Sequence, residues 1–424
     1  MTERNVNNGA GSALSKRNRN TYTQSGAKPR KQNNFNETRG KAFKVLTLAD
    51  LDGGSNERIS IENYTFLASY NWCKDNKPTI LVPGTPACWF PPELPLAIPK
   101  DDGQKRIEEN KDRIIVPRWA PLFAALQVMQ PTYSLGRIFL VIERHSLRQL
   151  FDFAAGRSGN DWRIDAEVVN GTLFLTRFEA NPRRYLNGSF HSGYGHSFEE
   201  SVLTFDEEVM ESLAHHRIVE YDIGGMKWIV RFEADGYIHD DNDTAESAAR
   251  AIVTESSQPL EQLSSTMDRI SLGTGPQIEM LEGVTVIHKG RIVSPASVIE
   301  VKCKKIGTGN KLAQKMPQCW FSQTRHLFIG QQQDGIVKKV EKIDLSGKFE
   351  WWEQERQDDL RKLMLVVRKI SEAANEGGYG KCCVLYDRQE NPRVLRFMEV
   401  DNRAGLELTE NLKEKFWGQT LAST

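Results

Sequence analysis

Apolar residues alternate with polar ones in several short runs of this chain, and two pairs of such runs are joined by tight-turn dipeptides. Residues 162–179 turn at Asn170-Gly171, and residues 217–235 turn at Gly224-Gly225. This pattern predicts two β-hairpins. Further strands are predicted at 137–142, 297–305, 326–330, 335–343, 381–386 and 393–400.

Other runs repeat their apolar residues every three or four positions, which predicts amphipathic helices at 145–156, 197–213, 317–324 and 351–375. Hairpins that are flanked by helices indicate an α+β fold. We therefore expect a mixed, largely antiparallel sheet flanked by helices.

Two segments differ in composition from the rest. Residues 1–41 carry nine Lys or Arg and two Glu, a net charge of +7, and hardly any large apolar side chains. This composition predicts a disordered basic tail, either simply solvated or used for nuclear import or RNA-backbone binding. Residues 236–283 form an acidic insertion that we also expect to be disordered. Residues 42–424 would otherwise form a single domain.

The composition of the whole chain excludes few functions. Lys plus Arg equals Asp plus Glu at 56 each, so global charge indicates no partner. No stretch approaches 18 apolar residues, which argues against a membrane span. Six cysteines without a CxxC pair predict reduced thiols in a protein of the nucleus, the cytoplasm or both.

Acidic side chains mark the ends of two predicted strands. Glu233 and Asp235 follow the apolar run 228–232, and Glu300 and Lys302 alternate with apolar residues in "VIEVKCKK". Alternation places Glu300 and Lys302 on one face. If the strands are neighbours, the clustered carboxylates would suit Mg²⁺ or Mn²⁺, whereas salt-bridged strand ends would explain the same residues without a metal.

The order of the motifs resembles the DXO family of RNA 5′-end decapping exonucleases, which have a PD-(D/E)XK nuclease-like core. "ERHSLRQLF" and the first hairpin are followed by "GYGHSFE", "RFEAD", "IEVK" and "WFSQTRHLFIG". The resemblance covers roughly residues 138–340. It implies that one or two Mg²⁺ or Mn²⁺ ions are coordinated by the side chains of Glu199, Glu233, Asp235 and Glu300 and the backbone carbonyl of Val301.

The resemblance also implies roles in catalysis and substrate binding. Lys302 would hold the attacking water or the scissile phosphate, together with Gln323, and Arg144 would contact a substrate phosphate. Arg148, one helical turn on, could serve in place of Arg144. Lys304, on the Lys302 face, would extend a basic rim for RNA phosphates. Each residue has a plainer explanation: Gln323 as a capping or surface amide, Arg144 as a surface salt-bridge partner, and the lysines as a solvated strip.

The expected function is a divalent-metal-dependent hydrolase acting on RNA 5′ ends, of the decapping, pyrophosphohydrolase or 5′-3′ exoribonuclease type. Water would attack a phosphodiester or phosphoanhydride, and Asp235, Glu300, Lys302 and Gln323 would form the catalytic set. Its partners would be the RNA 5′ end and an exoribonuclease or other RNA-processing protein. A catalytically inactive binding module and a DNA nuclease of the same superfamily are the alternatives. The chain departs from the family because 64 residues separate Asp235 from Glu300.

Overall fold

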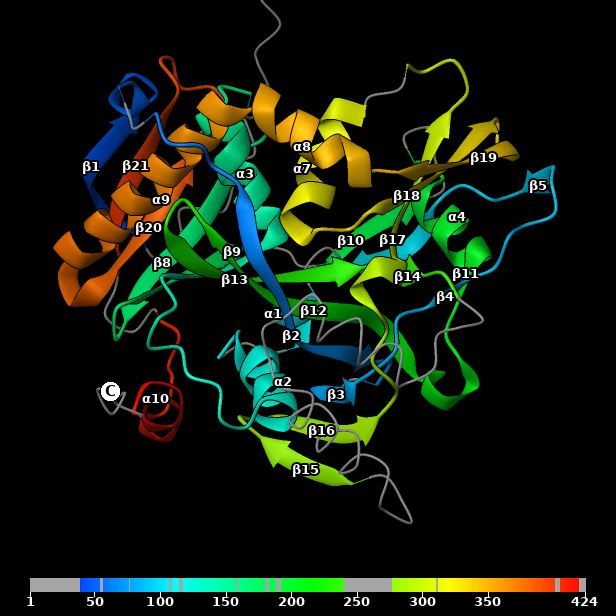
Figure 1. The fold of residues 1–424 in the computed structure, drawn as a ribbon, viewed down its shortest axis with the longest axis horizontal. Helices are drawn as coiled ribbons and strands as arrows, with labels where there is room; N and C mark the ends of the chain where they lie inside the picture. The colour runs from blue at the N-terminus through cyan, green and yellow to red at the C-terminus, as the bar shows by residue number, and fades with distance from the viewer. Residues whose placement is uncertain are drawn as a thin grey trace, which may run out of the picture.

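Two β-sheets, flanked by helices, form the framework of the protein (Figure 1). The computed structural model describes residues 39–418, apart from residues 54–55, 76, 107–108, 114–116, 158, 180–182, 188–191, 240–276, 310–311 and 401–404. Within this part of the chain, one sheet has twelve strands and the other has seven. Most neighbouring strands are antiparallel, so the predicted α+β fold with mixed, largely antiparallel pairing is confirmed, although the strands form more than the single sheet expected.

The large sheet contains both predicted hairpins. In spatial order its strands are β1 (Arg39–Thr47), β21 (Val394–Val400), β20 (Lys381–Tyr386), β8 (Trp162–Val169), β9 (Thr172–Phe178), β7 (Leu140–Glu143), β13 (Met226–Ala234), β12 (Ser212–Ile223), β2 (Ile61–Cys73), β3 (Thr79–Pro83), β16 (Val284–Lys289) and β15 (Ile278–Leu281).

The small sheet carries the lysine-bearing strand, β17. Its order is β11 (Leu203–Thr204), β4 (Cys88–Trp89), β14 (Gly236–Tyr237), β17 (Val298–Lys305), β18 (His326–Gln333), β19 (Ile336–Asp344) and β5 (Leu96–Ala97). A separate two-stranded sheet pairs β6 (Asp102–Arg106) with β10 (Arg183–Asn187).

The described helices are α1 (Glu109–Arg113), α2 (Ala120–Met129), α3 (Arg144–Ala154), α4 (Gly195–Val202), α7 (Leu312–Ser322), α8 (Ser346–Glu355), α9 (Gln357–Glu376) and α10 (Glu410–Trp417). Short 3₁₀ turns are η2 (Ala49–Leu51), η3 (Glu207–Val209), η4 (Pro295–Ser297) and η5 (Gly378–Gly380). None of these helices is long and apolar enough to span a membrane.

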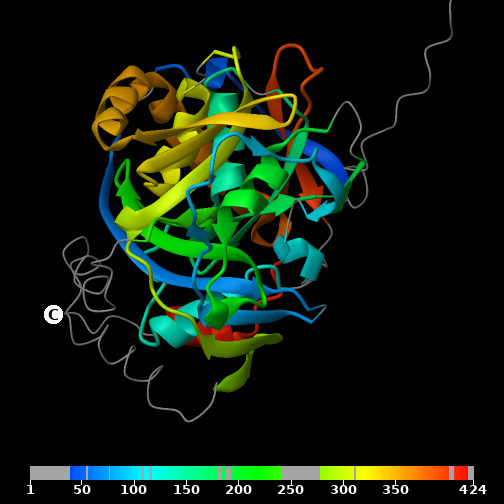
Figure 2. The same cartoon turned by 90° about the vertical axis from the view of Figure 1, so that its right-hand side faces the viewer.

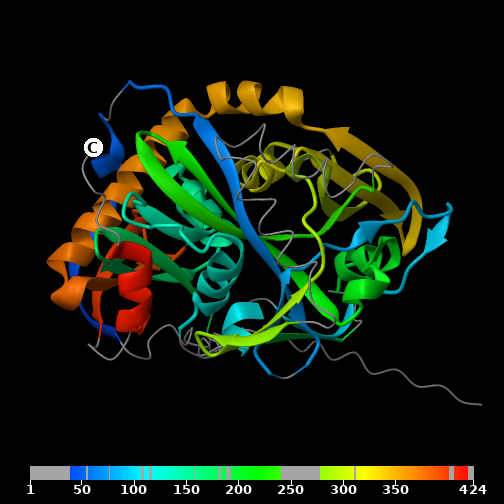
Figure 3. The same cartoon turned by 60° about the horizontal axis from the view of Figure 1, so that its bottom comes forward.

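The large sheet is covered on both faces, which explains its nearly continuous apolar strands. On β13, Trp228 and Val230 pack into the core formed with α3, α7, α8 and α9, while Ile229 packs into the core formed with α2 and α10. Figure 2 shows α10 (red) and α9 (orange) on opposite sides of this sheet. A third core lies between the small sheet and α4, which Figure 3 shows at the end of the molecule away from α9 and α10.

Several predicted boundaries are wrong. The expected helix at 197–213 ends at Val202, and the chain then forms β11, η3 and the start of β12. The single helix at 351–375 is two helices that meet at Arg356. The helix expected from residue 317 begins at Leu312, with Pro317 inside it.

Some residues of the two segments that were expected to be disordered form strands. β1 begins at Arg39, so the tail boundary at 41 falls inside a strand, and residues 1–38 lie outside the described residues. At the insertion, Gly236–Tyr237 and Ile278–Leu281 are strands, while residues 240–276 lie outside the described residues. All six cysteines are free thiols.

Gly330 of β18 allows α4 to approach the small sheet closely. A Cβ at this position would lie 2.6 Å from the Phe198 ring. We expect Gly330→Ala to lower the free energy of unfolding by about 1–3 kcal/mol, because the ring and its helix would have to move. Urea unfolding measures this loss. Gly347→Ala, where nothing lies within 4 Å of the added carbon, is the matched control. Equal stability of the two variants would contradict the prediction.

Candidate active site at the junction of the two sheets

Asp235 lies where the chain passes from the large sheet to the small one. β13 ends at Ala234 and β14 begins at Gly236, which pairs with Ile299 of β17. This register brings the Asp235 carboxylate to the edge of β17, where the backbone N–H of Val301 donates to its Oδ2 at 2.7 Å. The sequence prediction that Asp235 and the "IEVK" strand come together is therefore confirmed.

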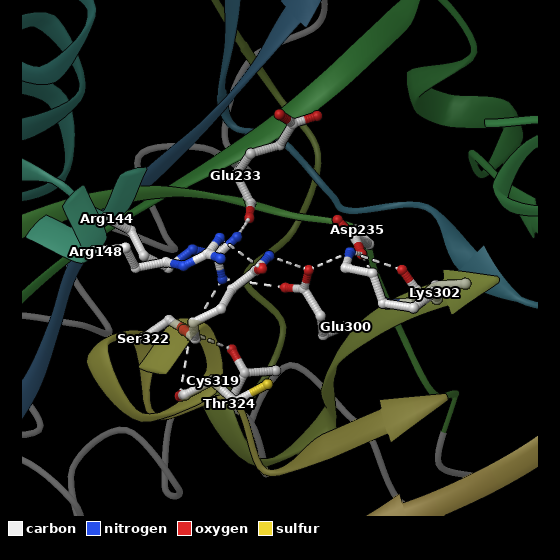
Figure 4. Close-up of polar contacts among 11 residues, drawn as sticks. Arg144, Arg148, Glu233, Asp235, Glu300, Lys302, Cys319, Ser322 and Thr324 are labelled. Atoms are coloured by element: carbon white, nitrogen blue, oxygen red, sulfur yellow. Dashed lines mark hydrogen bonds and ion pairs between the residues drawn. The ribbon is translucent and has the colours of Figure 1, made fainter. Parts of the chain in front are cut away.

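Lys302 joins the acidic groups (Figure 4). Its Nζ donates to Asp235 Oδ2 at 3.0 Å and to the Val301 carbonyl at 2.8 Å, and it forms an ion pair with Glu300 Oε1. This ion pair confirms that Glu300 and Lys302 share one face of β17. Two carboxylates and a carbonyl, three of the expected metal-binding groups, thus surround one ammonium group.

Arg144 supplies the second counter-charge. It opens α3 directly after β7, which is the parallel neighbour of β13. Its Nη1 donates to Glu300 Oε2 and to Ser322 Oγ, both at 3.1 Å, and its Nη2 donates to the Glu233 carbonyl at 2.9 Å. With 8% of its surface exposed, Arg144 is directed at protein acceptors, and its ion pair with Glu300 is buried rather than on the surface as the alternative had it.

The charges of the cluster determine its titration. Burial alone would raise the pKa of Glu300, but the Lys302 ammonium and the Arg144 guanidinium outweigh it and lower that pKa. Burial alone would lower the pKa of Lys302, but Asp235 and Glu300 outweigh it and raise that pKa. Lys302 therefore stays protonated at neutral pH, as a cation rather than a base. Burial, with Glu300 nearby, raises the pKa of Asp235.

Glu199 and Glu233 stand apart from the Lys302 contacts. Glu199 is half-buried on α4, and burial together with the charge of Asp235 raises its pKa to about 9. Glu233 is exposed, and its side chain points away from Glu300 in Figure 4, although its carbonyl binds Arg144. The structure thus places Glu199 near the cluster and turns the Glu233 carboxylate outward.

The amide of the site is Gln318, not the expected Gln323. Gln323 donates to the Trp320 carbonyl at 2.7 Å and lines a separate cavity of about 320 Å³ with Arg325. Gln318, five residues earlier and on α7, donates to Glu300 Oε1 and accepts from Arg148 Nη1 at 2.9 Å. Gln323 follows the last residue of α7 and has a φ of 53°, so its side chain leaves the helix face that carries Gln318.

Lys304, predicted to lie on a basic rim, is half-buried and forms an ion pair with Glu341 at 3.6 Å. The charge of Glu341 therefore offsets part of the positive potential expected there. The role of Lys304 in RNA binding stays a prediction.

The donor atoms of the cluster suit Mg²⁺ or Mn²⁺ in kind but not in number. Among the described residues, no three Asp, Glu, His or Cys side chains form a group that could hold a metal ion. Asp235, Glu300 and the Val301 carbonyl nevertheless direct hard oxygen atoms at one cationic nitrogen. A metal site here would need the ammonium to withdraw and a further donor, from Glu199 or Glu233, to turn inward.

The comparison with known proteins identifies a family. Residues 47–417 match the family described as a domain of unknown function, DUF8563. The chain belongs to this family. No curated protein matches the sequence of this DUF8563 member.

Solved structures share the fold of this DUF8563 chain. Rai1 of S. pombe is 11% identical with a TM-score of 0.52, over 84% of this chain and 99% of that one. Rai1 of Scheffersomyces stipitis is 12% identical with a TM-score of 0.55, over 88% and 99%. Rai1 of Candida albicans is 12% identical with a TM-score of 0.53, over 89% and 99%. The resemblance to decapping proteins that the motifs predicted is confirmed at the level of the fold.

The Arg144–Glu300 pair predicts a large loss of stability when it is broken. Arg144→Met would leave Glu300, which is 2% exposed, without its guanidinium partner. We expect the free energy of unfolding to fall by about 3 kcal/mol or more. Arg157→Met is the control, since Arg157 pairs with Asp359 on the surface and such pairs contribute about 0–1 kcal/mol. Urea unfolding of both variants checks this, and similar losses would contradict a structural role for Arg144.

Glu199 predicts a pH-dependent stability in EDTA. Because its pKa rises from 4.5 to about 9 on folding, the folded state binds more protons than the unfolded state between these pH values. This contribution to stability is complete below about pH 4.5 and is lost as pH rises towards 9. We expect Glu199→Gln to match the wild type near pH 5 and to be more stable at pH 8, as measured by thermal unfolding. Parallel pH profiles would show that the carboxyl titrates normally.

Proposed function

We propose that this protein is a divalent-metal-dependent hydrolase that acts on the 5′ ends of RNA. One observation carries the proposal: Asp235, Glu300, the Val301 carbonyl and Lys302 converge at the junction of two sheets in a fold shared with Rai1. Buried carboxylates on a strand edge, with an ammonium among them, are costly for a fold that needs them only for structure.

The ligands of the similar structures support this proposal. The Scheffersomyces stipitis Rai1 structure contains (3′-NADP)⁺ and a calcium ion, and the Candida albicans Rai1 structure contains pU5 and Mn²⁺. Nucleotide and divalent cation therefore occur together on this fold, and the oxygen donors of the present cluster are of the kind that such cations prefer.

The residues have distinct tasks in the proposed reaction. Asp235, Glu300 and the Val301 carbonyl would hold the cation, with Glu199 and Glu233 as further donors. The cation would activate water and stabilise charge on the phosphate. Lys302, whose raised pKa keeps it protonated, would orient a water or neutralise a phosphate oxygen.

Arg144 and Gln318 would position the cluster rather than touch substrate. Arg144 fixes Glu300 Oε2, and Gln318 contacts Glu300 Oε1 while it orients Arg148. This arrangement holds Glu300 in a single orientation, as a preorganised site requires.

A second candidate is a binding module that has kept the fold without catalysis. Lys302 already neutralises the acidic groups, and the Glu233 carboxylate points outward. Such a module would bind an RNA 5′ end, alone or with an exoribonuclease or other RNA-processing protein, in the nucleus or the cytoplasm.

Hydrolysis in Mn²⁺ separates the two candidates. We expect the wild-type protein to release product from capped, triphosphorylated or monophosphorylated RNA, and Asp235→Asn and Glu300→Gln to reduce the rate by about two orders of magnitude or more, because each removes a charged oxygen from the cation. DNA of the same sequence tests the substrate class.

The controls fix the interpretation. Lys369→Met, on α9 outside the cluster, should retain the wild-type rate. If wild-type protein binds RNA but yields no product, the binding module is the function. If the wild type and both site variants give equal product, a contaminating nuclease is responsible and the proposal fails.

A further inference from the structure

Among the described residues, Lys315 is a cation without a hydrogen-bond or ion-pair partner, and it lies beside the candidate active site. It lies on α7, half-buried, and forms no hydrogen bond or ion pair with any residue that the structure describes. Two other cations of the site are paired with carboxylates: Lys302 with Asp235 and Glu300, and Arg144 with Glu300. A half-buried ammonium without a counter-charge is unfavourable in the free protein.

The neighbours of Lys315 increase this cost. Burial, followed by the charge of Lys302, lowers the pKa of Lys315; the charge of Glu300 opposes this effect, and the charge of Arg148 adds to it. Arg148 is affected likewise, since burial and the charge of Arg144 lower its pKa. Lys315 and Gln318 are three residues apart on α7, and Gln318 binds Arg148. Lys315 and Arg148 therefore flank the same amide.

Glu300 is the carboxylate whose charge acts on Lys315, but its oxygen atoms are already engaged. Oε1 contacts Gln318 Nε2 and Lys302 Nζ, and Oε2 accepts from Arg144 Nη1 at 3.1 Å. Arg148 uses Nη1 for Gln318, which is a neutral acceptor. The charges of Arg148 and Lys315 are thus available to an anion from outside the protein.

We propose that Arg148 and Lys315 bind a phosphate group of single-stranded RNA, next to the phosphate that reacts at the Asp235–Glu300–Lys302 cluster. The inference rests on the proposed function for the identity of its ligand. A planar guanidinium combined with a compact ammonium matches the several oxygen atoms of a phosphate. Arg148, rather than Arg144, is then the arginine of α3 that contacts the substrate phosphate, because Arg144 is paired with Glu300.

RNA binding without catalysis tests this subsite. Binding of 5′-phosphorylated pentauridine is measured in EDTA by fluorescence anisotropy over a range of salt concentrations. We expect Lys315→Met and Arg148→Met each to weaken binding about tenfold. Each should also reduce the slope of log K against log salt by about 0.7, the contribution of one phosphate contact on a single strand. Lys315→Arg should retain the wild-type affinity and slope.

Stability distinguishes a substrate contact from a structural one. Lys315→Met should raise the thermal midpoint, since it removes an unpaired cation from among Lys302 and Arg148. Lys369→Met removes the same charge from α9 and should leave the salt slope unchanged. A lower midpoint for Lys315→Met would overturn the inference, because it would reveal a structural partner.

The outcomes separate this inference from the proposed function. If the wild type binds pentauridine but hydrolyses no RNA, and both methionine variants lose affinity and slope, the subsite stands and the hydrolase proposal fails. If both variants bind as the wild type does, the subsite is wrong whatever the activity. A wild-type protein that does not bind the RNA also overturns it.

Discussion

The buried carboxylate of Glu300 is the constraint on which the site depends. A charge at 2% exposure on a central strand of the small sheet is tolerable only when cations hold both of its oxygen atoms. Arg144 is the first residue of α3, which directly follows a strand of the large sheet. Lys302 lies two residues after Glu300 on β17. Glu300 thereby ties the two sheets together through Arg144.

Because of the buried Glu300 carboxylate, cations of the same residue type have different contacts. Arg144 is saturated by Glu300, Ser322 and the Glu233 carbonyl, whereas Arg148, one turn later, donates to a neutral amide. Lys302 is surrounded by oxygen atoms, whereas Lys315 has no such partner among the described residues. Position relative to Glu300 therefore decides which cations hold the protein together and which face a ligand.

Local sequence signals were sufficient for much of the fold and part of the site. The turns at Asn170-Gly171 and Gly224-Gly225 defined the hairpins, and alternation on β17 placed Glu300 with Lys302. Signals that depend on distant packing failed. The resemblance implied Gln323, yet this residue follows the last turn of α7 with a φ of 53°, and Gln318 on the helix contacts Glu300 instead. Nor could spacing reveal that the Glu233 carboxylate turns outward, because the chain changes sheets two residues later.

The contact between Gly330 and Phe198 links two segments that are 132 positions apart in the sequence. The aromatic ring on α4 occupies the space that a side chain on β18 would need. Enlarging either residue alone would therefore lower the stability of the fold. Within the DUF8563 family, a larger residue at the first position should be accompanied by a smaller one at the second. Such paired replacement would keep the distance between α4, which carries Glu199, and β17, which carries Lys302, unchanged across the family.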